Sequence, residues 1–129
     1  MQSKLIYSIC LIFALQCAMQ RLYAQPSVAI DTAKERLQKI IHQFPDSAEI
    51  TIRSITIDGH KRTKEYIILR EIPFRAGSKF SAGQLEGVIE QARLNVFNTL
   101  LFLEVIPRIT NWSETQIDLL FDVKERWYF

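Results

Sequence analysis

The spacing of apolar residues changes twice between residues 50 and 123, and this change constrains the fold more than any other feature of the 129-residue chain. Residues 52–57 alternate between apolar and polar side chains, as a half-buried strand does. Residues 81–101 carry apolar side chains every three or four positions, which predicts an amphipathic helix. Alternation returns over residues 103–123, interrupted by the polar residues 111–115. A strand, a helix and a hairpin therefore follow one another within one small domain.

A shorter helix is predicted between the first strand and the long helix. Residues 63–72 have a helical pattern that Pro73 ends, and residues 74–79 are predicted to be a loop. Gly59 and Gly77 occupy turn positions, which suit glycine because it adopts positive φ easily. We therefore predict an α+β fold in the order β-α-α-β-β, with two helices covering one face of a three-stranded mixed sheet.

The position of Pro107 predicts how the strands are arranged. Proline lacks a backbone donor and is confined to edge strands and bulges, so residues 103–110 are expected at an edge of the sheet. Residues 117–123 alternate without a proline and suit the centre. Because two helices bring the chain back across the sheet, the first strand is expected to run parallel to the last.

The first 48 residues are expected to lie outside this domain. Lys4 followed by the apolar residues 5–15 and a cut after Ala24 resembles a secretory signal peptide, residues 1–24. An uncleaved membrane anchor is the alternative. Residues 25–48 form a lead-in with an amphipathic helix, predicted from the capping pair Thr32 and Glu35 and ended by Pro45.

Charge and cysteine content exclude several functions. The chain has 16 Lys and Arg against 14 Asp and Glu, and cleavage after residue 24 lowers the net charge from +2 to 0. A neutral domain gives no electrostatic case for binding nucleic acid. Cys10 and Cys17 leave with the signal, which excludes a disulfide framework. No catalytic residues, cofactor or small-molecule substrate are predicted. No metal ligands are predicted either, since His42 and His60 lie on different elements.

Several short patterns in the order of the predicted elements resemble a known family. They are Ile52-x-x-Ile55-x-Ile57-x-Gly59, residues 66–71, Phe74-x-x-Gly77, Asn98-Thr-x-Leu-Phe102-x-x-Val105 and the ending Val123-Lys-Glu-Arg126. Together they resemble a polypeptide-transport-associated (POTRA) domain over residues 49–126. Such domains precede the membrane barrel in the outer-membrane assembly-factor and surface-antigen family, and the ending resembles Bacteroidetes-like relatives.

The resemblance implies a non-enzymatic periplasmic module at the outer membrane. It would bind unfolded outer-membrane proteins or periplasmic accessory proteins by adding their extended chains to an edge strand. The matching edge is residues 103–110, and Pro107 either weakens it or guards it against aggregation. The expected partner-binding residues are Leu103, Val105, Ile106, Arg108 and Ile109.

The end of the chain is expected to lead toward the barrel, which this sequence lacks. Trp127, Tyr128 and Phe129 form an aromatic run that requires burial or a membrane interface, so they are predicted to be the barrel junction. Two alternatives remain: a stand-alone soluble periplasmic adaptor, and a single-span inner-membrane protein with one such domain.

Overall fold

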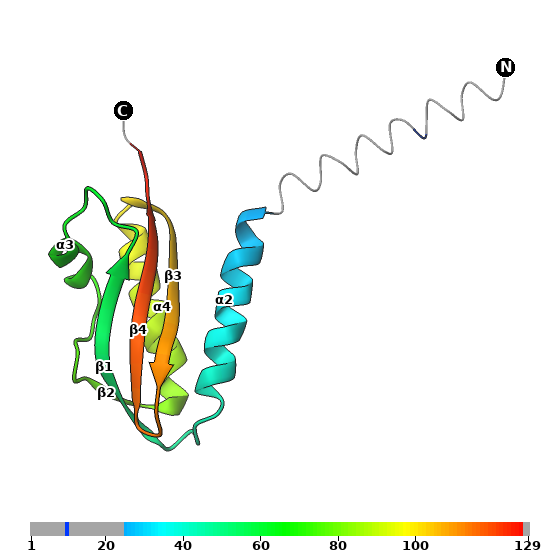
Figure 1. The fold of residues 1–129 in the computed structure, drawn as a ribbon, viewed down its shortest axis with the longest axis vertical. Coiled ribbons are helices and arrows are strands. Elements are labelled where there is room, and N and C mark those ends of the chain that lie inside the picture. The colour runs from blue at the N-terminus through cyan, green and yellow to red at the C-terminus, as the bar shows by residue number, and fades with distance from the viewer. Residues whose placement is uncertain (1–9, 11–24, 128–129) are drawn as a thin grey trace. The chain divides into compact units, whose positions relative to one another are not determined.

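The computed structural model describes Cys10 and residues 25–127 (Figure 1). The chain divides into two compact units, residues 1–32 and residues 33–129. The predicted signal peptide, residues 1–24, lies outside the described residues apart from Cys10, which is exposed. The second unit contains the sheet and the candidate site.

Helix α2, Gln25–Ile41, precedes the sheet and crosses the boundary between the two units. The prediction that this helix begins at Thr32 with a capping box is wrong. Thr32 lies inside the helix, and its hydroxyl donates to the carbonyl of Val28 (2.8 Å), one turn earlier. In the second unit, Leu37 and Ile41 lie one turn apart and are both buried in the core.

The sheet has four strands in the order β2-β1-β4-β3, so the prediction of three strands is wrong. The predicted mixed sheet is confirmed, because β1 and β4 are parallel and the other two pairs are antiparallel. The last strand lies inside the sheet and the strand with Pro107 lies at its edge, as predicted. The strands are β1 (Glu49–Asp58), β2 (Lys79–Ser81), β3 (Phe102–Trp112) and β4 (Gln116–Glu125).

The additional strand forms where the sequence predicts only a loop. Gly77 donates its N–H to the carbonyl of Ile52 (2.7 Å), and Ile52 donates to the carbonyl of Ser78 (2.9 Å). These bonds bring the next three residues beside the start of β1 as β2. Phe80 of this strand meets Phe74 edge to face, with ring centroids 5.9 Å apart. Three residues are too few to show an apolar period, so the sequence pattern did not reveal this strand.

Two helices of unequal length connect the strands, α3 (Glu65–Leu69) and α4 (Ala82–Asn98). The prediction of a helix over residues 63–72 overestimates α3. After α3 the chain continues in a turn, in which Ile72 donates its N–H to the carbonyl of Leu69 (3.2 Å). Helix α4 lies where the apolar period places it. Its N-cap residue is Ser81, as predicted, but the Ser81 side chain makes no capping hydrogen bond.

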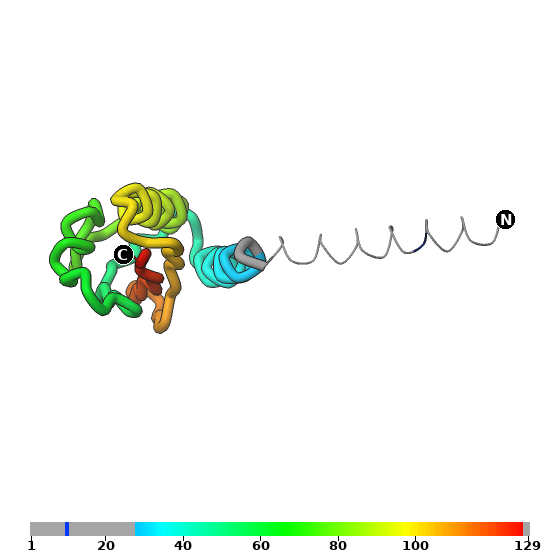
Figure 2. The backbone as a smooth tube through the Cα atoms, turned by 90° about the horizontal axis from the view of Figure 1, so that it is seen from above, coloured from blue at the N-terminus to red at the C-terminus, as the bar shows by residue number. Residues whose placement is uncertain are grey.

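One core fills the space between α4 and one face of the sheet (Figure 2). The alternating residues of β4 point into it, and the apolar stripe of α4 faces them. Removing such side chains from water contributes about 1.5–3 kcal/mol each. The fully buried side chains of these two elements are Leu85, Ile89, Ala92, Val96, Ile117, Leu119 and Phe121.

The end of β1 depends on a glycine. Gly59 has φ of +86°, and a Cβ atom at this position would collide with the carbonyl oxygen of Val123 on β4. Gly77 has φ of +93° but open space where a Cβ would lie. Gly59 is therefore required by both conformation and close approach, and Gly77 by conformation alone.

Candidate functional site: the open edge of strand β3

Strand β3 pairs with β4 along one side, and no strand of the described chain pairs with its other side. Such a side presents backbone N–H and C=O groups that can bond another extended chain. The register shifts between Phe102 and Glu104 and again between Ile109 and Asn111. These two irregularities bound a regular segment, residues 104–109.

The hydrogen bonds at the two ends of the hairpin show which residues of β3 face outward. Ser113 donates to the carbonyl of Gln116 (2.8 Å), and Arg126 donates to the carbonyl of Leu101 (2.9 Å). Backbone groups of successive strand residues point alternately to the two sides, so the register between these bonds assigns each residue a side. The bonding groups of Glu104, Ile106 and Arg108 point to β4. The bonding groups of Val105, Pro107 and Ile109, the other three residues of the regular segment, point away from β4.

Pro107 therefore lies where its missing N–H removes no bond from the sheet. It faces Phe121 across the ladder at a position whose backbone groups point outward. The open side keeps two donors, the N–H groups of Val105 and Ile109, and three carbonyl acceptors. This placement explains why a proline is compatible with an eleven-residue strand.

The expected partner-binding residues divide into three groups in the structure. Val105 and Ile109 direct their side chains into the core and their backbone groups to the open side. Leu103 lies in the irregular segment and is 49% exposed. Ile106 and Arg108 bond to β4 through their backbones, so they provide no backbone hydrogen-bonding group on the open side.

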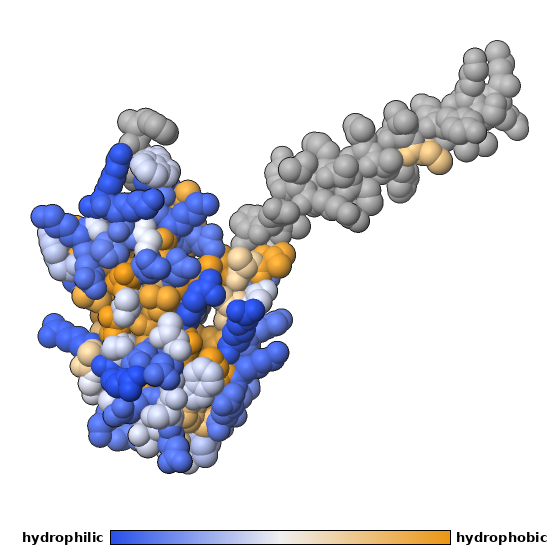
Figure 3. Space-filling model, viewed as in Figure 1, coloured by the Kyte–Doolittle hydropathy of each residue, from blue (hydrophilic) through white to orange (hydrophobic). Residues whose placement is uncertain are grey.

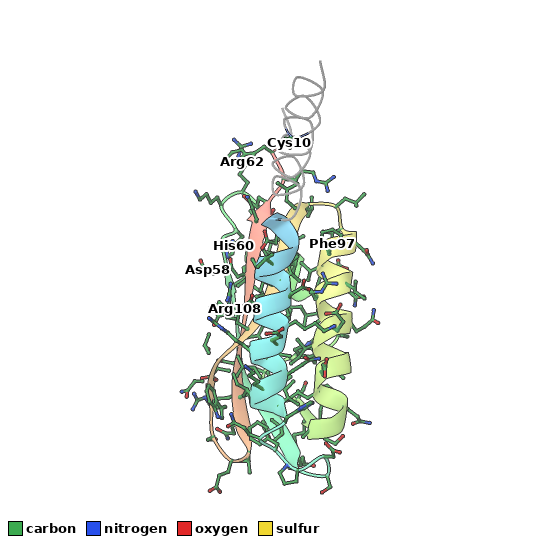
Figure 4. The ribbon with its side chains drawn as sticks, turned by 90° about the vertical axis from the view of Figure 1, so that its right-hand side faces the viewer. Cys10, Asp58, His60, Arg62, Phe97 and Arg108 are labelled. Atoms are coloured by element: carbon green, nitrogen blue, oxygen red, sulfur yellow. The ribbon has the colours of Figure 1, made fainter. Side chains whose placement is uncertain are left out.

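Ile106 and Arg108 belong to the face of the sheet opposite the core. Ile106 is buried, while Arg108 forms an ion pair with Asp122 of β4 (Nη2 to Oδ2, 3.6 Å). Figure 4 shows Arg108 along the side of the strands, away from α4. The side chains of a bound strand would alternate between the two faces of the sheet. Ile106 and Arg108 could contact only those on the face opposite the core.

Toward the hairpin end, the same face carries a carboxylate with several partners. Asp118 of β4 accepts hydrogen bonds from the guanidinium of Arg53 and from the hydroxyl of Ser54 (2.8 Å), both on β1. The bond from Arg53, stronger than the opposing desolvation, lowers the pKa of Asp118. The face therefore presents paired charges.

The second half of α2 lies next to the candidate edge. Figures 1 and 4 show residues 33–41 beside β3, on the side of α4. Gln38 of this segment donates to the carboxylate of Glu86 on α4 (Nε2 to Oε1, 2.6 Å). Leu37 and Ile41 anchor it in the core. An extended chain that adds to β3 would thus run alongside α2.

At the far end of β4, a carboxylate holds the loop that follows β1. The Glu125 side chain accepts hydrogen bonds from the backbone N–H groups of Arg62 (3.0 Å) and Thr63 (2.7 Å). Desolvation raises the pKa of Glu125, but these backbone bonds outweigh it and the net pKa is lowered. The guanidinium of Arg62 lies over the ring of Trp127, 5.0 Å from its centroid. Residues 128–129 of the predicted junction lie outside the described residues.

No local sequence pattern marks Glu125 as important. Its partners precede it by 63 and 62 positions, so no local spacing could reveal the contact. The pair Lys124 and Arg126 on either side of it suggests an ordinary exposed strand end. Only the parallel pairing of β1 with β4 brings the loop after β1 to this carboxylate.

Metal sites and membrane spans were also sought within the described residues. There, no group of three or more His, Cys, Asp or Glu side chains could hold a metal ion. The ring of His60 contacts the carbonyl of Thr63 (3.0 Å), while His42 is exposed. None of the helices that the structure describes is both long and apolar enough to cross a membrane.

The fold and the edge define a class of protein: an α+β domain whose four-stranded sheet ends in a long edge strand. The POTRA family, described as surface antigen variable number repeat, matches residues 50–126. Because this match covers more than half of the chain, the chain belongs to the POTRA family.

Solved structures show the same fold at low sequence identity. The BamA structure from Haemophilus ducreyi lacking POTRA domains 1–3 matches at 22% identity and a TM-score of 0.51 over 60% of this chain and 14% of that one. The N-terminal domain of Omp85 from the cyanobacterium Thermosynechococcus elongatus matches at 19% identity and a TM-score of 0.51, over 62% of this chain and 32% of that one. The chain thus spans about a third or less of these proteins. No curated protein sequence matches it.

Proposed function

We propose that residues 49–126 form a periplasmic, non-enzymatic polypeptide-binding module of an outer-membrane protein assembly factor. Membership of the POTRA family and the shared fold with BamA and Omp85 structures support this assignment. Its clients are unfolded outer-membrane proteins or periplasmic accessory proteins. Export through the signal peptide of residues 1–24, attachment to a barrel after residue 129, and a Bacteroidetes-like origin are parts of the same proposal.

The observation that carries the proposal is the open side of residues 104–109. Its bonding groups belong to the main chain, so they recognise an extended backbone whatever its side chains are. This property suits a receptor for many clients. Two donors and three acceptors alternate along the segment, and a client would match them with its own backbone groups. Because Pro107 lacks a donor, a client carbonyl opposite this position remains without a partner.

Backbone NMR on the full chain tests this mode of binding. An extended apolar peptide should shift the amide signals of Val105 and Ile109 and slow their exchange with solvent, because these two N–H groups point to the open side. The neighbouring amides of Ile106 and Arg108 are already bonded to β4 and should exchange slowly with or without the peptide. Shifts confined to α3 and α4 would rule out binding at the edge.

Two substitutions on the same edge give opposite expectations. Pro107→Val adds an outward donor and should strengthen peptide binding about fivefold, the equivalent of one additional hydrogen bond. Val105→Pro removes an outward donor and should weaken binding by a similar factor. Equal affinity for both variants, with both correctly folded by circular dichroism, would contradict the proposed edge.

A further inference from the structure

The end of the domain where the chain leaves β4 exposes several large apolar side chains. Leu100 is 58% exposed, Leu103 49% and Trp127 58%. Leu101, next to Leu100 in the chain, joins the two ends, because it lines the same hollow as Trp127 and accepts a hydrogen bond from the backbone N–H of Arg126. In the space-filling view, apolar and strongly polar surface lie side by side at this end (Figure 3). We call Leu100, Leu103, Trp127 and the basic residues around them the exit patch.

Leu100 has an unusual backbone conformation for its residue type. Its φ is +62°, and it is the only residue other than glycine with positive φ in the described chain. It follows Thr99, the C-cap of α4, at the place where glycine or asparagine commonly ends a helix. A leucine in this conformation is strained, because its Cβ approaches the following carbonyl oxygen. The chain thus gives up stability at a position where the side chain is exposed to solvent, and such a compromise indicates a function.

Basic residues adjoin this end of the domain, and two of them, Arg62 and Arg126, line the same hollow as Leu101 and Trp127. In the described part of the chain none of them forms an ion pair with a carboxylate. The carboxylate of Glu125, which lies among them, faces the backbone N–H groups of the loop after β1. It forms no ion pair with the neighbouring cations, and its single negative charge offsets only part of their positive charge. The exposed basic residues of the exit patch are Lys61, Arg62, Lys64, Lys124 and Arg126.

The exit patch is held in place by contacts between distant parts of the chain. Glu125 fixes the backbone of Arg62 and Thr63 on the end of β4. Arg62 in turn lies over the ring of Trp127. The loop after β1 and the end of β4 are thus held together, so binding to a flat partner costs them little conformational entropy.

From this arrangement we propose that the exit patch docks on the headgroup layer of an anionic phospholipid membrane. Tryptophan prefers the boundary between headgroups and acyl chains, and exposed leucines can enter the same depth. Lysine and arginine near an anionic surface each strengthen binding about fivefold. An acidic polypeptide would match the cations but would not bury the exposed leucines. This contact is separate from the binding of clients at β3, so either proposal can fail without the other.

The two tryptophans of the chain allow a direct test, because Trp112 is 44% exposed at the hairpin, the opposite end of β4 from Trp127. Two full-chain variants are compared, Trp112→Phe, which retains Trp127, and Trp127→Phe, which retains Trp112. Each is mixed with vesicles of phosphatidylglycerol that carry bromine on their acyl chains. We expect the fluorescence of Trp127 to be quenched and that of Trp112 to be unaffected. Equal quenching of both tryptophans, or quenching of neither, would overturn the proposal.

Charge and strain provide two further readouts on the same vesicles. The double substitution Lys61→Gln and Arg126→Gln should lower the affinity for vesicles, measured by the quenching of Trp127, by an order of magnitude or more. The matched pair Lys39→Gln and Arg75→Gln, which lies outside the exit patch, should not. Leu100→Gly should raise the melting temperature and yet reduce the quenching. If soluble polyglutamate binds the patch and vesicles do not, the partner is an acidic protein and the membrane proposal is wrong.

Discussion

The two edges of the sheet differ in how far another strand covers them. At one edge, the three-residue strand β2 covers the beginning of β1, tied by the bonds between Ile52 and its neighbours Gly77 and Ser78. At the other edge, β3 is eleven residues long and no described strand covers it. Pro107, the two register shifts and the neighbouring residues 33–41 of α2 (Figure 1) are its local safeguards. The difference agrees with the proposal that β3 is the side kept for partners.

The largest expected effect comes from proline substitutions at two neighbouring positions of β3. Ile106→Pro removes an N–H that bonds to β4, together with a buried side chain, and should destabilise the domain by about 3 kcal/mol or more. Val105→Pro removes an outward N–H and leaves the ladder intact, so its cost should be about 1–2 kcal/mol, mainly from altered packing. Urea denaturation of both variants measures the difference. Equal losses would mean that the outward assignment of Val105 is wrong.

The two glycines with positive φ test different parts of the sheet, Gly77 the edge covered by β2 and Gly59 the end of β1 against β4. Gly59→Ala adds a Cβ that collides with the carbonyl of Val123 in addition to backbone strain, and should cost about 2–4 kcal/mol. Gly77→Ala, where the Cβ meets open space, should cost about 1 kcal/mol from the positive φ alone. Thermal denaturation compares the two variants. A larger loss for Gly77→Ala would show that β2 contributes more to stability than the end of β1 does.

The loop clamp at Glu125 should make stability depend on pH. Its folded pKa is lowered, so its contribution is complete above the unfolded value near pH 4.3 and is lost as the pH falls through the folded value. Glu125→Gln should therefore lower the free energy of unfolding at pH 7 by about 1 kcal/mol and have less effect at pH 3. Asp118 titrates in the same direction and remains in the variant as a background. An equal effect at both pH values would argue that the charge of Glu125 is unimportant.

The smallest effect is expected at the ion pair that joins β2 to β1. Lys79 and Glu49 lie 2.9 Å apart (Nζ to Oε1), but both side chains are largely exposed. Lys79→Gln should change stability by about 0.5 kcal/mol or less, and high salt should remove the difference. A loss above 1 kcal/mol would mean that β2 is held mainly by this pair and not by its backbone bonds.

Much of the fold could be predicted because its main elements carry a local period. The apolar spacing of residues 85–96 identifies α4, and the alternation of residues 117–123 identifies β4. Pro107 correctly placed its strand at an edge, since the rule concerns one residue and its missing donor. The limits of α2 and α3 were harder, because tertiary packing decides how far a weak helical pattern extends.

The candidate site could be predicted only in part for a related reason. Residues 103–110 were identified as an edge, but the selection of Ile106 and Arg108 as binding residues did not distinguish the two sides of the strand. That distinction depends on the register with β4, which two bulges shift. Neither bulge has a sequence signal in this chain.

The sequence by itself determined the order of the main strands and helices, the apolar faces, the central place of β4 and the family resemblance. Each of these follows from residue types at fixed local spacing. Only the tertiary structure decided that residues 79–81 form a strand, which backbone groups of β3 point outward, and that Glu125 holds the loop at Arg62. Those features depend on hydrogen bonds between residues far apart in the chain, and such bonds leave no period in the sequence.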